Sequence, residues 1–298
     1  MIHSKHSQPL VSIIMPTHNA NVGFLREAID SCIAQTYPCW ELIIVDDGST
    51  NESPLVIAEQ RSRDSRIRSL RHDSKRRLPA ALNSGIEQAQ GDFLTWLSDD
   101  DRFRPLALER MLKFLSEHPQ IDIVYADYSL LQSDGTLGER MRVGPAEELG
   151  IHKPVGICYL AKYEAFARTG FSEDFFLAED LDFWIRACMT YKATPLHEDL
   201  AQYRQHSGTL TQSHPRTEIL LVHRRILDRH LDRMHWLSPP NKVRAYLRLG
   251  KQFLAQGAAA PAAAAFGRAA GLGPRACTAA LSNLITRKIG QCTQLQRL

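Results

Sequence analysis

Three consecutive carboxylates, Asp99, Asp100 and Asp101, directly follow Ser98 and the apolar run 93–97. Ionised carboxylates at this spacing repel one another, and burial at the end of a strand raises the free energy of their charged forms further. A divalent metal that also binds a phosphorylated ligand would remove the conflict, because hard cations take oxygen ligands and share them with phosphates. The alternative is an acidic turn that caps the next helix, since Asp is common in both places.

A second pair of carboxylates, Asp46 and Asp47, ends the apolar run 41–45 and leads into Gly48 and Ser49. Taken alone, this segment is typical of a plain turn. In sheets of parallel strands, ligands bind beyond the carboxyl ends of the strands. Because both acidic segments follow predicted strands, we expect them to lie at one binding site.

The elements that would position these groups follow from the pattern of apolar residues. Short apolar or β-branched runs predict strands at 10–15, 41–45, 67–70, 93–97 and 121–125. Between the strands, apolar residues recur at helical spacing. One such helix is predicted over 79–90, and Gly91 is expected to end it as a C-cap. The alternation predicts an α/β domain whose mostly parallel sheet is covered on both faces.

The length of 298 residues suits one large domain, or one domain of about 210 to 220 residues with an appendage. Residues 1–214 carry 22 Lys and Arg against 30 Asp and Glu, whereas residues 215–298 carry 14 against 3. We therefore predict an acidic domain at 1–214 and a basic extension at 215–298. Residues 1–9 do not resemble a signal peptide and no run is apolar enough to span a bilayer, so we expect a cytoplasmic chain.

The basic extension is predicted to be helical throughout. We expect an amphipathic helix over 216–235 and a helix pair over 243–275 that resembles one tetratricopeptide unit. The charge of this extension suggests an anionic partner, either the inner face of the membrane or a protein. Nucleic acid is not expected, because no binding motif accompanies the charge. A solvated basic surface is the alternative.

Seven stretches of the chain, taken in order, resemble the family 2 glycosyltransferases, which have the GT-A fold. The resemblance covers roughly residues 10–212. The matching stretches are Val11-Ser-Ile-Ile-Met-Pro-Thr-His-Asn19, Glu41-Leu-Ile-Ile-Val-Asp-Asp-Gly-Ser49, Leu78-Pro-Ala-Ala-Leu-Asn83 with Gly85, Gly91-Asp-Phe-Leu-Thr-Trp-Leu-Ser-Asp-Asp-Asp101, Gly170-Phe171, Glu179-Asp-Leu-Asp-Phe-Trp-Ile-Arg186 and Tyr203-Arg-Gln-His206. The resemblance implies a three-layer α/β/α GT-A domain with a mixed, mostly parallel sheet, followed by the helical extension.

The resemblance also implies that a nucleotide-diphospho-sugar binds at the strand ends. Pro16, Thr17 and Asn19 match the segment that shapes the nucleotide pocket. Asp46 or Asp47 would accept a hydrogen bond from the base ring, and a uracil N–H suits that contact. A donor of the uridine diphosphate type is therefore favoured.

Four further residues belong to the implied donor site. Arg76 and Arg77 could meet the diphosphate, with solvated surface arginines as the alternative. Asn83 would orient the acidic loop or would simply lie on a helix face. Asp99 is expected near the ribose.

The family's metal-binding aspartates correspond to Asp100 and Asp101, and His206 matches a position that supplies one further ligand. The metal would be Mn²⁺ or Mg²⁺, which fit oxygen ligands best. It would bridge the two phosphates of the donor and neutralise the leaving diphosphate. Ser98 is a departure, because it stands where the commonest pattern has an aspartate.

The family's general base corresponds to Asp180, with Glu179 as a neighbour that could exchange roles with it. An inverting transfer needs a carboxylate to take the proton from the acceptor hydroxyl as that hydroxyl attacks. The alternative is that both residues cap the helix that follows. The two interpretations are compatible, because the positive end of a helix keeps a carboxylate ionised.

The predicted function is an inverting, metal-dependent transfer of a sugar to a hydroxyl of a saccharide or glycolipid acceptor, in surface polysaccharide biosynthesis. The alternative is a catalytically silent scaffold that binds sugar nucleotides and acts through its C-terminal helices. A nicotinamide-dependent oxidoreductase is not favoured, because no Gly-x-Gly-x-x-Gly follows the first strand.

Overall fold

The computed structural model describes residues 8–274 of the chain. The described residues form two compact units. The first unit comprises residues up to 146 together with 154–209, and the second comprises 147–153 together with the residues from 210 onward. The short segment 147–153 therefore lies with the C-terminal helices although the chain returns to the first unit after it.

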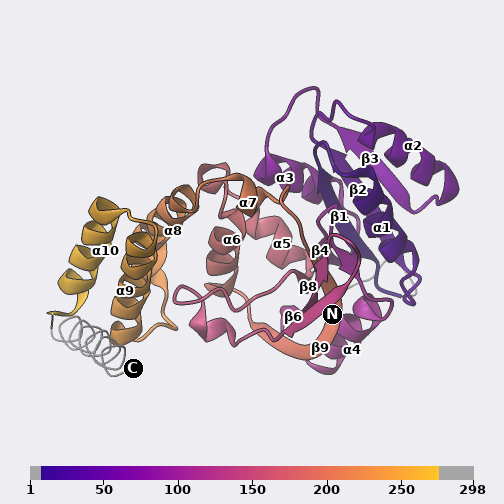
Figure 1. Cartoon of the computed structure of the whole chain (residues 1–298). Helices are drawn as coiled ribbons and strands as arrows, with labels where there is room; N and C mark the ends of the chain where they lie inside the picture. Colours follow the sequence, from indigo (N-terminus) through magenta and orange to yellow (C-terminus); the bar gives the residue numbers. More distant parts are fainter. Residues whose placement is uncertain (1–7, 275–298) are drawn as a thin grey trace, which may run out of the picture. The chain divides into compact units, whose positions relative to one another are not determined.

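The first unit is built on a single mixed sheet, which within the described residues has nine strands (Figure 1). The strands are β1 (Val11–Thr17), β2 (Trp40–Asp46), β3 (Ile67–Arg71), β4 (Phe93–Trp96), β5 (Arg102–Phe103), β6 (Ile123–Gln132), β7 (Leu137–Met141), β8 (Cys158–Lys162) and β9 (Ala193–Gln205). Their order is β3-β2-β1-β4-β8-β6-β9-β5, and β7 pairs with β6.

One half of this sheet is parallel and the other half is mixed. The neighbours β3, β2, β1 and β4 all run parallel, so their carboxyl ends share one edge. Beyond β4, strand β8 runs antiparallel, while β6 and β9 run parallel to each other. The short β5 pairs antiparallel with β9, with Arg102 opposite Gln202. This pairing brings the acidic loop that precedes β5 to the end of β9.

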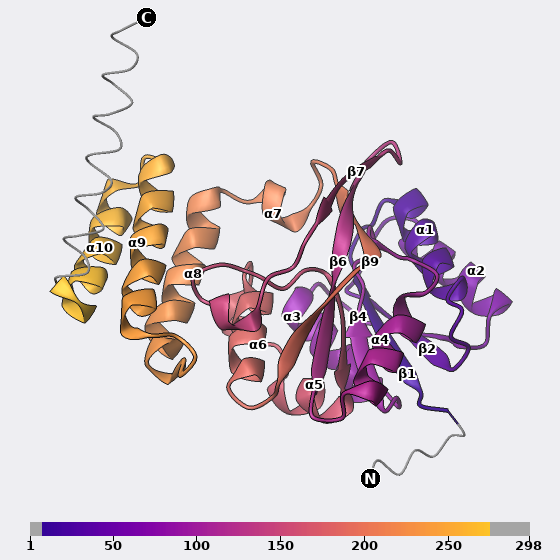
Figure 2. The ribbon, with the colours of Figure 1, turned by 90° about the horizontal axis from the view of Figure 1, so that it is seen from below.

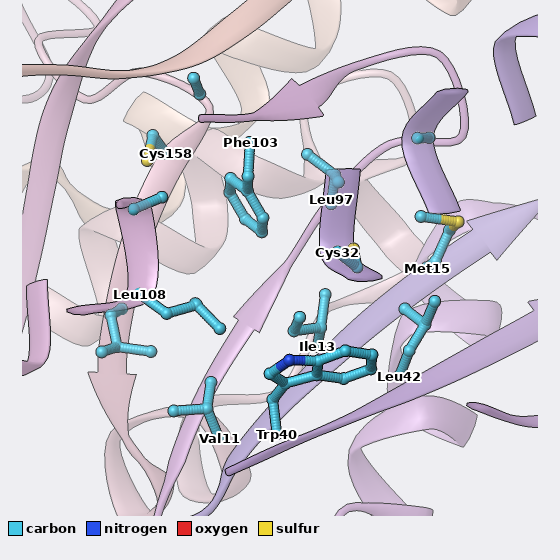
Figure 3. Close-up of a cluster of buried hydrophobic side chains, with 14 of the residues drawn as sticks. Val11, Ile13, Met15, Cys32, Trp40, Leu42, Leu97, Phe103, Leu108 and Cys158 are labelled. Carbon is cyan, nitrogen blue, oxygen red and sulfur yellow. The ribbon is translucent and has the colours of Figure 1, made fainter. Parts of the chain in front are cut away.

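Helices cover both faces of the sheet. The helices of this unit are α1 (Val22–Ile33), α2 (Ser53–Arg63), α3 (Leu78–Gln88), α4 (Ala107–Glu117), α5 (Tyr163–Thr169) and α6 (Glu179–Cys188). Residues Val11, Ile13 and Met15 of β1 share a buried cluster with residues of α1, α2 and α4, and Figure 3 shows part of this cluster around Trp40. Strand alternation turns Ile14 to the other face, where α3 lies.

Two glycines allow close approaches on that second face. A Cβ added at Gly85 of α3 would lie 2.4 Å from the Ile14 side chain, as expected of a helix packed tightly on the sheet. Gly91 differs from its expected role, because α3 already ends at Gln88 with Ala89 in the capping position. A Cβ at Gly91 would instead meet the Ser12 backbone nitrogen at 2.6 Å. Gly91 is therefore required by the approach of the chain to β1 and not by the helix end.

In the second unit a short helix precedes longer helices that lie side by side in both ribbon views (Figures 1 and 2). They are α7 (Leu210–Ser213), α8 (Arg216–His230), α9 (Pro239–Ala255) and α10 (Ala259–Leu272), with a 3-10 turn at Leu231–Arg233. The helical extension and its helix pair α9–α10 agree with expectation, and the end of the predicted pair, residue 275, lies outside the described residues. Among the helices that are described, none combines the length and apolar character required to cross a membrane.

Candidate active site

The acidic loop after β4 meets the end of β9. His206 Nε2 lies 2.8 Å from Asp100 Oδ2, although 106 residues separate them in the chain. Asp101 is buried, and its Oδ1 accepts a hydrogen bond of 2.8 Å from the Arg204 backbone amide. The antiparallel pairing of β5 with β9 explains this contact, because it aligns the loop with the last residues of β9.

The electrostatics of the loop match the repulsion expected from three adjacent carboxylates. Burial raises the pKa of Asp99 to about 7, and the charge of Asp100 adds to the increase. Interactions with the Thr17 side chain and with the His18 backbone oppose this shift. Burial and the charge of Asp100 also raise the pKa of Asp101 well above its usual range. Burial and the neighbouring charge therefore disfavour the ionised forms of Asp99 and Asp101, which a cation in the loop would stabilise.

The donor atoms of this loop fit a hard divalent cation whose coordination a ligand completes. Within residues 8–274, no group of three or more His, Cys, Asp or Glu side chains is arranged to hold a metal ion. The three predicted ligands therefore do not form a complete protein cage. Asp100 and His206 do converge, offering one oxygen and one nitrogen. Mg²⁺ and related ions commonly bind through one or two protein carboxylates, with phosphate oxygens and water in the remaining positions.

The loop after β2 is organised by two carboxylates. Asp46 is buried and pairs with Arg71 Nη1 at 2.5 Å and with the Ser49 backbone amide at 2.9 Å. Asp47 is also buried, and its Oδ1 lies 2.7 Å from both His72 Nδ1 and the Arg76 backbone nitrogen. Its Oδ2 accepts a 2.7 Å hydrogen bond from the next backbone amide.

Asp47 therefore ties the loop after β2 to the segment before α3. A carboxylate has about four acceptor positions, and three of those on Asp47 are in use. Counted over the described residues, one position remains for a ligand donor such as a base N–H.

The end of β1 adjoins these two loops. Asn19 has a φ of +52°, and its Oδ1 accepts hydrogen bonds from the backbone amides of Thr50 (2.8 Å) and Asn51 (3.2 Å). Pro16 and Thr17 are buried in β1. The Asn19 side chain thus fixes the loop after β2 rather than pointing freely outward. The edge of the sheet at which donor binding is predicted is thus shaped by Asp46, Asp47 and Asn19.

Of the two arginines predicted to meet the diphosphate, Arg77 adjoins the segment that leads to α6. Arg77 has a φ of +75°, and its guanidinium lies over the Phe176 ring at 5.0 Å from the ring centroid. Both neighbours, Arg76 and Arg77, bind Asp47 through their backbone amides. Leu177 also has a positive φ, +81°. Uncommon backbone angles of this kind in non-glycine residues are found often at functional sites.

Asn83 contacts a different segment from the one expected. Its side-chain nitrogen donates to the Phe171 carbonyl and its oxygen accepts from the Phe171 amide, both at 2.8 Å. It therefore secures the Gly170–Phe171 turn on the path to α6, and not the acidic loop. This paired contact requires an amide side chain, because it uses one donor and one acceptor.

The two candidates for the general base, Glu179 and Asp180, lie at the start of α6. Glu179 is buried in the first turn, and Asp180 Oδ1 accepts a 2.7 Å hydrogen bond from the Leu181 amide. Asp180 also lies close enough to Tyr159 of β8 to add to the pKa increase that burial causes in that phenol. Asp182 is fully buried and pairs with Arg186 at 2.7 Å, which holds the helix in place.

Sequence reasoning missed three residues that organise the site. Arg204 contacts the acidic loop, and His72 contacts Asp47. Phe176 lies against the guanidinium of Arg77. For Arg204 the sequence offered one signal, a charged residue near the end of a strand that is otherwise half-buried. His72 and Phe176 carried no local signal, because their contacts lie far away in the sequence.

The sequence matches the model of the glycosyl transferase family 2 over residues 12–164. TuaG of Bacillus subtilis, a putative teichuronic acid biosynthesis glycosyltransferase, is 32% identical over 152 residues, covering 51% of this chain and 56% of TuaG. EpsJ of the same organism, an uncharacterized glycosyltransferase, is 30% identical over 244 residues, 76% of this chain and 68% of EpsJ. The match with TuaG thus spans only about half the length of that protein.

Solved structures share the fold. TarS of S. aureus (residues 1–349), determined with UDP-GlcNAc, superposes with a TM-score of 0.60 at 18% identity, covering 81% of each chain. The mannosyltransferase PcManGT of Pyrobaculum calidifontis, determined with GDP-Man and Mn²⁺, gives 0.60 at 20% identity, covering 96% of this chain and 82% of that one. These likenesses confirm the expected GT-A type domain. Together with the family match, they show that the chain belongs to glycosyl transferase family 2.

Proposed function

We propose that this protein transfers a sugar from a nucleotide-diphospho-sugar to a hydroxyl of a saccharide or glycolipid acceptor, with inversion at the anomeric carbon. The observation that carries the proposal is the meeting of Asp100 and His206 at the strand-end edge where Asp46 and Asp47 also lie. Family membership and the sugar nucleotides named for TarS and PcManGT support it.

The donor would bind along the ends of β1, β2 and β4. The remaining acceptor position of Asp47 would take a base N–H, and we favour a uridine nucleotide on that basis. Thr17 and Asp99 would lie toward the ribose, since the two already interact at the end of β1. Arg76 would be available to the diphosphate, while the contact of Arg77 with Phe176 directs that guanidinium toward the segment before α6.

Asp100 and His206 would hold a divalent cation, Mn²⁺ or Mg²⁺, together with the donor phosphates, and Asp101 would support it from a buried position. When bound, this cation supplies charge neutralisation for the leaving diphosphate. Burial, and after it the charge of Asp100, raises the pKa of Asp99 and Asp101, and a bound cation would stabilise the ionised forms of both carboxylates.

Asp180 would act as the general base. It would accept the proton of the acceptor hydroxyl while the hydroxyl oxygen attacks the anomeric carbon from the side opposite the diphosphate. It stands in the first turn of α6, where the positive end of the helix stabilises a negative charge. Glu179, one residue earlier, is the candidate that would take over this role.

The acceptor would belong to a surface polysaccharide or its lipid-linked precursor. TuaG is named for teichuronic acid biosynthesis, and RfbC of Myxococcus xanthus, 37% identical over 130 residues, is named for O-antigen biosynthesis. Both names refer to surface polymers, and the proposal extends that substrate class to this chain.

The basic helices would attach the enzyme to an anionic membrane surface. Arg244, Arg248 and Lys251 are exposed along one side of α9, at the spacing of successive helical turns. Arg248 contacts His152, and burial followed by the Arg248 charge lowers the pKa of that imidazole. The three exposed cations on this side of α9 would suit negatively charged lipid headgroups.

Release of nucleoside diphosphate from a panel of sugar nucleotides, with and without Mn²⁺, tests the proposal. We expect one donor to be hydrolysed slowly without acceptor and only with the metal present. Donor binding without any turnover, even with acceptor extracts, would favour the silent scaffold instead. Binding of no donor at all would contradict both functions.

A further inference from the structure

Arg204 is a buried cation at the centre of the contacts between the acidic loop, β9 and α1. Only 1% of its surface is exposed. Its Nε donates a 2.8 Å hydrogen bond to the Asp100 carbonyl oxygen, and its backbone amide donates to Asp101 Oδ1 at 2.8 Å. One residue therefore holds the acidic loop by its main chain and by a side chain.

The register of the sheet accounts for this position. Arg102 of β5 pairs with Gln202 of β9, and the strands run antiparallel. Continuing this register places residue 204 opposite residue 100, which is where the Arg204–Asp100 hydrogen bond is found. The strand pairing thus delivers the guanidinium beneath the loop, while His206 follows one residue beyond the end of β9.

Two residues of α1 hold the guanidinium in place. Arg204 Nη2 forms an ion pair with Glu27, and the guanidinium carbon lies 4.1 Å from the centroid of the Phe24 ring. The Phe24 ring also contacts the His206 ring, with centroids 5.2 Å apart. Glu27 is further paired with Arg102 Nη2 at 3.0 Å. A buried guanidinium requires such partners, because an unpaired buried charge is strongly unfavourable.

We propose that Arg204 is a positioning residue for the phosphate–metal site, fixing Asp100 and His206 relative to each other by clamping the acidic loop to α1. This inference rests on the proposed function for the identity of the ligand. Arg204 acts through Asp100 and through Phe24, and not by contact with the sugar nucleotide. Partners that orient metal ligands typically change metal affinity by about 10- to 100-fold when they are lost.

The test compares Arg204→Gln, Arg204→Lys and Glu27→Gln with the unaltered chain. Hydrogen–deuterium exchange of the metal-free protein measures the mobility of the peptide that covers residues 98–103. Calorimetry measures the affinity for Mn²⁺ in the presence of UDP. Arg68→Gln is the matched control, because Arg68 pairs with a buried carboxylate, Glu41, on another part of the sheet.

For Arg204→Gln we expect faster exchange in residues 98–103 and an affinity for Mn²⁺ about tenfold lower. UDP binding without metal should change little. Arg204→Lys keeps the positive charge but loses the planar guanidinium with its several donors. The exchange rate of residues 98–103 and the affinity for Mn²⁺ should therefore fall between those of the Gln variant and the unaltered chain. The Arg68→Gln control should alter neither quantity. A purely structural role would instead speed exchange across the whole first unit.

Unchanged loop exchange and unchanged Mn²⁺ affinity in folded Arg204→Gln would overturn the proposal. If that variant does not fold, Glu27→Gln decides, because Glu27 is 44% exposed and its change should leave the fold intact. Loop exchange and Mn²⁺ affinity unchanged in Glu27→Gln would then overturn it. If the unaltered protein shows no metal-dependent UDP binding, the proposed function fails, and the exchange data alone decide on Arg204.

Discussion

His72 Nδ1 lies 2.7 Å from an Asp47 oxygen, while its Nε2 lies 3.0 Å from the Ser84 hydroxyl. The imidazole therefore links the loop after β2 to α3. Because Asp47 also binds the amides of Arg76 and Arg77, the histidine is one of three fixed contacts that orient this carboxylate. These three contacts fix the position of Asp47 within the loop after β2.

Replacing His72 should loosen the loop after β2, because two of the contacts that hold this loop to α3 are lost. His72→Phe keeps the ring volume but removes both hydrogen bonds, and should lower the free energy of unfolding by about 1–3 kcal/mol. UDP affinity should also fall several-fold, because Asp47 loses a partner. Urea unfolding and calorimetry measure the two effects. His118→Phe is the control, since His118 packs against Phe114 of α4 and should leave UDP affinity unchanged. Equal UDP affinity in both variants would contradict this account of Asp47.

Removing the proposed base should separate binding from turnover. Asp180→Asn keeps the shape of the side chain but cannot accept a proton, so kcat should fall by about 10²- to 10⁴-fold. The dissociation constant for the donor should stay within about twofold. Steady-state kinetics and calorimetry distinguish the two, with Asp134→Asn in an exposed hairpin turn as the control. A kcat near that of the unaltered enzyme would remove Asp180 from the mechanism.

Two glycines of the helix pair should respond to alanine with opposite signs. A Cβ at Gly250 of α9 would lie 2.6 Å from the Phe266 ring, whereas a Cβ at Gly267 of α10 meets no atom within 4 Å. Gly250→Ala should therefore destabilise the helices by about 1–3 kcal/mol. Gly267→Ala should stabilise them by about 0.5–1 kcal/mol, because alanine favours helix. Thermal unfolding monitored by circular dichroism measures both, and destabilisation by both changes would argue against this packing.

The basic side of α9 should govern membrane attachment. Changing Arg244, Arg248 and Lys251 together to Ala should weaken binding to vesicles that contain phosphatidylserine, by about 1 kcal/mol for each cation. Donor hydrolysis should be retained. Sedimentation with vesicles measures the loss. The matched control is the triple change of Arg61, Arg63 and Lys113, which removes the same charge from the first unit. Equal vesicle binding by both triple variants would contradict a specific role for α9.

The fold of the first unit was largely predictable because its signals are local. The apolar runs predicted β1 to β4, and the structure has these strands close to the predicted positions. Gly91 was misread because a glycine after a helix can be needed for a neighbouring strand as well as for a cap. The partner of Asn83, Phe171, lies 88 residues away and follows only from the packing of α3.

The site was predictable only where residue types carried the chemistry. The acidic residues could be located from their types and their positions after strands. The contact between Asp100 and His206 needed the family pattern, because it depends on how β5 pairs with β9. The contact of Arg204 with Asp100 could not be predicted for the same reason, because it depends on the register of β5 against β9, which no local pattern in the sequence specifies.

The most direct test of the central claim is calorimetric titration of the protein with a panel of sugar nucleotides, with and without Mn²⁺. We expect one donor to bind tightly only when the metal is present, and Asp100→Ala to abolish that metal dependence. Donor binding of equal strength with and without Mn²⁺, or an Asp100→Ala variant that keeps the metal effect, would contradict the proposed metal–diphosphate site.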